Sequence, residues 1–69
     1  MATMLDAAIS MWDNGMRVIP LNGKKALIPW AKYQNETPTQ EDVEAWWDRW
    51  PTANVGIITG KDVVVFDAD

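Results

Sequence analysis

The first twenty residues predict a helix followed by a strand. Apolar side chains recur at i, i+4 and i+7, at Leu5, Ile9 and Trp12. This spacing is typical of one face of an α-helix, and Asn14-Gly15 supplies residues that tolerate the backbone conformation in which many helices end. The following segment, 16–21, is mostly apolar and reads as a short strand with its proline near an end or at a sheet edge.

The middle of the chain predicts a loop and a second helix. A turn at 22–25 leads into a stretch, 26–38, that contains two prolines and no sustained period, so we expect an irregular loop there. Thr39 is placed to cap a helix, with Asp42 at the capping-box position. The apolar face of this helix would consist of Val43, Trp46, Trp47 and Trp50.

The last part of the chain predicts a β-hairpin. Residues 54–59 and 63–66 have the composition of strands, and Gly60-Lys61 forms the turn between them. The second run is apolar at every position, which is typical of a central strand covered on both faces, yet the sequence ends three residues later. We therefore expect an α/β (α+β) fold in the order α-β-loop-α-β-β, formed by residues 1–69 as the truncated N-terminal part of a single domain.

Composition limits the chemistry that this chain can perform. It has 69 residues, a net charge of −4, 48% hydrophobic residues, and neither cysteine nor histidine. Thiolate or histidine zinc sites and histidine-based triads are excluded. No apolar run reaches the roughly 18 residues of a membrane span, so we expect a cytoplasmic protein with no membrane contact. The acidic balance argues against a free-standing nucleic-acid binder.

Five tryptophans in so short a chain either build the core or stack on nucleic-acid bases. The helical spacing of those in the second helix favours a buried face. Trp30, in the loop beside Pro29, has no such spacing. If one of the five is exposed for a partner, we expect it to be Trp30.

The sharpest chemical feature is a pair of carboxylates after the last apolar run. Asp67 and Asp69 are two positions apart, and side chains alternate along a strand, so both are expected on one face. Mg²⁺ and Mn²⁺ prefer hard oxygen ligands of this kind. The alternative is that the two aspartates only favour a turn at the strand end.

Two lysine-bearing turns, at Lys24 and at Lys61, invite comparison with phosphate-binding loops. Neither is a P-loop, because Asp62 follows Gly60-Lys61 where Ser or Thr is needed, and a strand follows where a helix is needed. Solvated turns are the simpler interpretation of both lysines. Thr59-Gly60 is likewise explained by hairpin geometry.

The order of these features resembles a known family. It runs through Val18 to Leu21, Gly23-Lys24, Trp30, the helix with Trp46-Trp47, Ala53 to Ile57, Thr59-Gly60, and Val64 to Asp69. It is similar to the N-terminal part of the prim-pol domain, the bifunctional DNA primase/polymerase family of the archaeo-eukaryotic primase superfamily, found in phages, plasmids and integrated elements.

The resemblance implies a partial core related to the RNA-recognition fold and template-directed nucleotidyl transfer. Asp67 and Asp69 would be catalytic and hold Mg²⁺ or Mn²⁺, and Lys24, Thr59 and Gly60 match stretches that would contact nucleotide. The partners implied are a DNA template and primer, nucleoside triphosphates and a fused or associated helicase. The family's second motif needs a histidine, which this chain lacks, and the acidic residue of its third motif would lie beyond Asp69. We therefore expect the 69 residues to be inactive alone.

A different class of function also fits the sequence. A small phage or plasmid protein without enzymatic activity would bind a partner through its tryptophan-rich helix and complete its sheet by strand addition. Continuation of the reading frame past Asp69 would distinguish the two.

Overall fold

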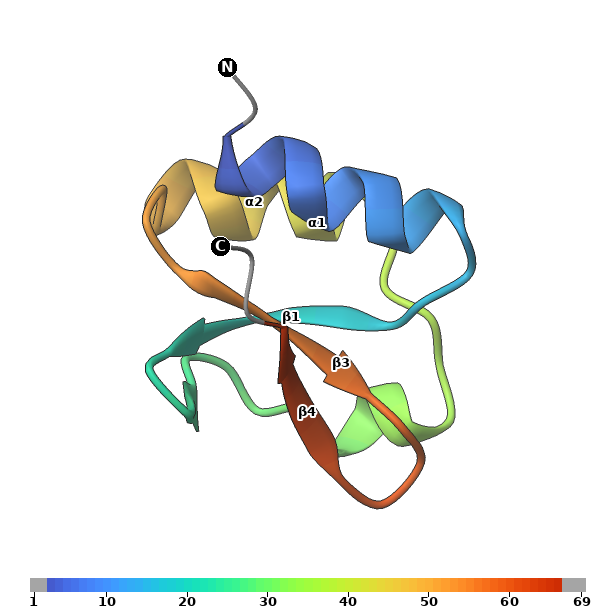
Figure 1. The fold of residues 1–69 in the computed structure, drawn as a ribbon. Coiled ribbons are helices and arrows are strands. Elements are labelled where there is room, and N and C mark those ends of the chain that lie inside the picture. Colours follow the sequence, from blue (N-terminus) through green and yellow to red (C-terminus); the bar gives the residue numbers. More distant parts are fainter. Residues whose placement is uncertain (1–2, 67–69) are drawn as a thin grey trace.

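The computed structural model describes residues 3–66 and forms two helices against a four-stranded antiparallel sheet (Figure 1). The elements are α1 (Met4–Asp13), β1 (Val18–Asn22), β2 (Lys25–Ala26), the 3₁₀-helix η1 (Ala31–Gln34), α2 (Gln40–Arg49), β3 (Asn54–Ile58) and β4 (Val63–Phe66). The expected α+β class and the element order are confirmed. Asp67 and Asp69 lie outside the described residues.

Both helices begin at a reciprocal capping box. The Thr39 hydroxyl accepts from the Asp42 N–H, and the Asp42 carboxylate accepts from the Thr39 N–H, both at 3.1 Å. Thr3 and Asp6 make the same pair of bonds at the start of α1. These bonds satisfy N–H groups that the first helical turn leaves without partners. The expected cap at Thr39 is confirmed, and the shorter Asp side chain suffices for it.

The strands are ordered β2-β1-β3-β4. β1 pairs antiparallel with β3, with Val18 opposite Ile57, and β3 pairs with β4, with Val55 opposite Phe66. The hairpin expected from the sequence is thus confirmed. Within the described residues, however, β4 is an edge strand and not a central one, and Val64 is 52% exposed.

The sheet separates two apolar clusters. On one side, α1 and α2 cover Val18 and Val55. On the other side, Ile19, Leu21 and Ile58 pack with Tyr33 from η1. Figure 1 shows the helices above the sheet and η1 below it. Neighbouring residues of β1 therefore enter different clusters, which explains why this strand is apolar at successive positions.

The segment 26–38 is more ordered than its sequence predicts. The Leu27 N–H donates to the Pro20 carbonyl at 3.0 Å, next to the short β2 pairing, and η1 follows. The Arg17 guanidinium donates to the Tyr33 and Gln34 carbonyls. The expectation of an irregular loop is wrong at β2 and η1, because contacts to β1 and to Arg17, distant in sequence, order these residues.

The tryptophans of α2 are core residues, as their spacing predicts. Trp47 is 2% exposed, and its indole N–H donates to the Ala53 carbonyl at 3.0 Å. Trp46 is half-buried and meets Tyr33 edge-on at 5.5 Å between ring centroids. Trp30 is also half-buried. Among the described residues no helix is long and apolar enough to cross a membrane.

Candidate functional site

The two candidate metal ligands follow β4 directly in the sequence. The structure describes β4 as far as Phe66, which is opposite Val55 in β3. Asp67 and Asp69 lie outside the described residues. The geometry that can be described is therefore that of the sheet end at which β4 stops.

Lys24 belongs to that end of the sheet. It lies in the turn between β1 and β2, where Gly23 adopts a φ of 63°, a conformation that favours glycine. The Asn54 amide donates to the Gly23 carbonyl at 3.4 Å and so connects this turn to the start of β3. Lys24 itself is exposed.

Thr59 and Gly60 lie at the opposite end of the sheet. They form the turn between β3 and β4, in which the Thr59 N–H and hydroxyl both donate to the Asp62 carbonyl, at 2.9 and 3.3 Å. Gly60 has a φ of 96°. Because β1 and β3 are antiparallel, the register separates this turn from Lys24 by the length of a strand. The three candidate nucleotide-binding residues are therefore not brought together.

Close packing around the middle of β3 explains why residue 56 is a glycine. A Cβ there would lie 2.7 Å from Leu21 Cδ1 and 2.9 Å from Val63 Cγ1. Such distances are sterically excluded, so the Leu21 and Val63 side chains would have to move to admit a Cβ. The glycine of the stretch Ala53 to Ile57 is thus explained by close packing of these two side chains on β3.

A groove of about 490 Å³ lies at the same end of the sheet as Lys24. It is lined by Gly23, Asn54 and the residues that end α2, among them Arg49 and Trp50. The Arg49 guanidinium lies 5.0 Å from the centre of the Trp50 ring, which is a cation–π distance. Arg49 does not stand out in the sequence as a candidate ligand-binding residue. A basic residue in the last turn of a helix is already explained by its favourable interaction with the helix dipole.

Charge is strongly segregated between the two layers of the molecule. The two helices hold one basic residue, Arg49, and six acidic ones: Asp6, Asp13, Glu41, Asp42, Glu44 and Asp48. Among the other described residues only Glu36 and Asp62 are acidic, and five are basic: Arg17, Lys24, Lys25, Lys32 and Lys61. The net negative charge therefore belongs to the helical layer, and the sheet with its loops is positive.

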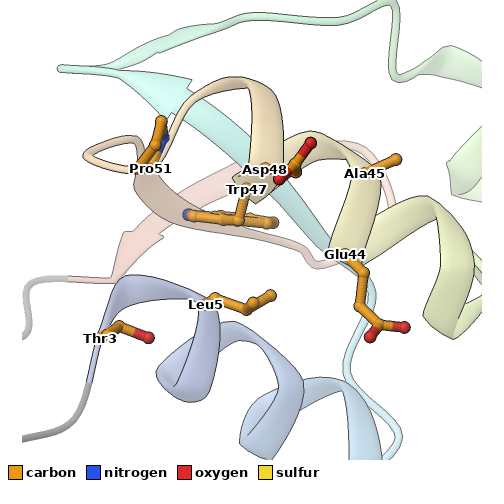
Figure 2. A pocket seen from close by; sticks show the side chains of 7 residues that line it. All are labelled: Thr3, Leu5, Glu44, Ala45, Trp47, Asp48 and Pro51. Atoms are coloured by element: carbon orange, nitrogen blue, oxygen red, sulfur yellow. The ribbon is translucent and has the colours of Figure 1, made fainter.

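Figure 2 shows a groove of the acidic layer, between α1 and α2. Its volume is about 590 Å³, and Leu5 and Trp47 contribute apolar surface to it. Glu44 and Asp48 stand at its rim. Carboxylates in this position repel phosphate, so nucleic acid is not expected to bind on this side.

Within residues 3–66, no three acidic side chains converge in a way that would hold a metal ion. The described carboxylates are distributed along the helix surfaces and in turns.

Comparison with protein families gives one match. The family described as Prim-Pol, bifunctional DNA primase/polymerase, N-terminal, matches residues 8–69. Searches of curated proteins and of solved structures find no match. The family match begins within α1 and includes every strand as well as Asp67 and Asp69. The chain belongs to the Prim-Pol family, the N-terminal domain of bifunctional DNA primase/polymerases.

Proposed function

We propose that this chain supplies the first metal-binding motif of a template-directed DNA primase/polymerase. Asp67 and Asp69 are its metal ligands, and the substrates are a DNA template with primer and nucleoside triphosphates. The observation that carries the proposal is the family match, which runs through the β3–β4 hairpin into Asp67-Ala68-Asp69. Among residues 3–66 no three acidic side chains converge, so the described part of the chain offers no competing cluster of that size.

The donor chemistry of the pair fits Mg²⁺ or Mn²⁺. Two carboxylates supply hard, negatively charged oxygens, and Mg²⁺ is commonly held by one or two carboxylates together with substrate phosphates. A bound ion would favour deprotonation of the attacking 3′-hydroxyl and would stabilise the negative charge that develops on the departing pyrophosphate. The completing ligands would come from nucleotide, water and further acidic residues of the domain.

The alternation along β4 predicts the side of the sheet on which the pair acts. Val63 and Val65 pack on the cluster below the sheet, away from α1 and α2. Continued alternation would direct Asp67 and Asp69 to that same side. This is the side away from the acidic helices, so the arrangement removes the electrostatic objection to DNA binding that the net charge raised.

Lys24 is the better candidate for a nucleotide contact. It lies at the sheet end where β4 stops, and a flexible ammonium group is a common phosphate ligand. Thr59 and Gly60 lie at the other end, and their hairpin hydrogen bonds already account for them. We therefore assign the phosphate contact to Lys24 and give Thr59-Gly60 a structural role.

Primer extension tests the proposed function, and we take the full-length protein for it to be a longer chain that includes these 69 residues and the remaining motifs of the domain. We expect a labelled primer to be extended in the presence of Mg²⁺ or Mn²⁺, with the added nucleotide following each change of the template base. Extension should stop with EDTA, because EDTA removes the ion and nothing then stabilises the negative charge that develops in the transition state. A pure preparation that adds no nucleotide with either metal, or that ignores the template base, contradicts the proposal.

A further inference from the structure

Trp30 lies in an open groove on the positive layer of the molecule. The groove has a volume of about 640 Å³ and is lined by Lys25, Ala26, Ile28, Pro29, Trp30, Ala31 and Gln34. The Trp30 ring is half-buried and packs on the cluster below the sheet. The tryptophan with no helical spacing to explain it thus lines a groove together with a lysine.

A second groove adjoins the first. It is lined by Ile28, Pro29, Lys32, Tyr33 and Trp46, so the two share Ile28 and Pro29. Lys32 is exposed, and its ammonium nitrogen lies 4.9 Å from the centre of the Tyr33 ring. Each of the two grooves is therefore lined by one lysine, Lys25 in the first and Lys32 in the second.

The charge of this surface is different from that of the helical layer. No acidic residue lines either groove around Trp30. The grooves over α2, in contrast, are bordered by Glu41, Glu44 and Asp48. An anionic ligand is therefore favoured at Trp30 and disfavoured on the helices.

We propose that the groove at Trp30 binds single-stranded nucleic acid, with one base against the indole and backbone phosphates beside Lys25 and Lys32. Proteins that hold single strands combine a positive groove with an aromatic ring on which a base stacks, and this surface has both. The inference rests on the proposed function for the identity of the ligand and deepens it, because it assigns the strand to one face of the domain.

The stacking part is tested by a pair of substitutions at Trp30 in the full-length protein. Affinity for a fluorescent oligo-dT is measured by anisotropy, with EDTA present and nucleotides absent. Trp30→Phe retains a flat ring and should bind within about threefold of wild type, whereas Trp30→Leu retains apolar packing without a ring and should bind about tenfold or more weakly. Thermal melts confirm that both variants fold. Trp30→Met, another apolar side chain without a ring, replaces Trp30→Leu should that variant fail to fold, and the same loss is expected.

The phosphate part is tested by salt dependence. Each phosphate contact contributes about 0.7 to the slope of log K against log salt for a single strand. The double variant Lys25→Ala/Lys32→Ala should reduce the magnitude of the slope by about 1.4. Lys61→Ala, which removes a lysine that lines neither groove, should leave the slope nearly unchanged.

Three results would overturn the inference. One is equal binding by Trp30→Phe and Trp30→Leu, and another is a Lys61→Ala effect as large as that of the double variant. The third is that Trp30→Leu loses as much affinity for duplex DNA as for single-stranded DNA, because a paired base cannot stack on the indole. These assays need neither metal nor Asp67 and Asp69, so an enzyme that extends primers but shows any of these results refutes this inference and leaves the proposed function standing.

Discussion

Asp67→Asn and Asp69→Asn should each abolish primer extension by the full-length protein, with a loss of at least about a hundredfold. Asn keeps the shape of the side chain and removes the charge that, in our proposal, holds a divalent ion. Transition-state charge stabilised by a metal contributes several kcal/mol, and each 1.36 kcal/mol corresponds to a factor of ten in rate. The measurement is the initial rate of single-nucleotide incorporation with Mg²⁺ and, separately, with Mn²⁺.

Asp62→Asn is the matched control for this loss. Asp62 is an exposed carboxylate in the β3–β4 turn, and its backbone carbonyl, which the substitution leaves in place, accepts the bonds from Thr59. This variant should extend primers at the wild-type rate. If Asp67→Asn or Asp69→Asn does so as well with both metals, the pair has no catalytic role and merely favours a turn at the end of the strand.

Trp47→Ala should cost about 3–5 kcal/mol of unfolding free energy, the largest effect we expect from a substitution in the described core. Trp47 is 2% exposed and packs in the cluster formed by α1, α2 and the sheet. Its indole N–H donates a hydrogen bond to the Ala53 carbonyl. Removal leaves a cavity and a carbonyl without its partner. Denaturant titration followed by circular dichroism measures the change.

Two other substitutions test whether the lost unfolding free energy comes from the buried volume of the Trp47 ring. Trp47→Phe keeps most of the apolar volume and should lose less than Trp47→Ala. Trp50→Ala removes a ring of equal size that is only half-buried and caps the end of α2, so it should also cost less. A Trp47→Ala variant destabilised by under about 1 kcal/mol would show that this ring is not central to the core.

The sequence predicts the elements whose signals are local. Thr39 and Asp42 are three residues apart, so a capping box between them can be anticipated without knowing the fold. The β3–β4 hairpin is equally local, since Gly60 marks the turn between two apolar runs. β2 and η1 were missed because the bonds that order them reach to Pro20 and Arg17, which no periodicity reveals.

In the candidate site, too, local features could be predicted from the sequence and features that depend on the fold could not. Asp67 and Asp69 stand out from their two-residue spacing and from the family resemblance alone. That Lys24 and Thr59 lie at opposite ends of the sheet required the antiparallel register of β1 and β3. The charge segregation is partly visible in the sequence, because no Lys or Arg precedes Arg17, but its meaning depends on which elements form the outer layer.

The proposed metal site can be tested by cleavage of the chain with bound iron. Fe²⁺ replaces Mg²⁺ in the full-length protein, and with ascorbate and peroxide it generates radicals that cut nearby backbone. We predict cuts next to Asp67 and Asp69 and at the same sheet end, around Lys24 and Asn54, suppressed by excess Mg²⁺ and lost in Asp67→Asn. Mass spectrometry of the fragments identifies the positions. Cuts confined to the Thr59–Asp62 turn, or a pattern unchanged in Asp67→Asn, would contradict a metal site on Asp67 and Asp69.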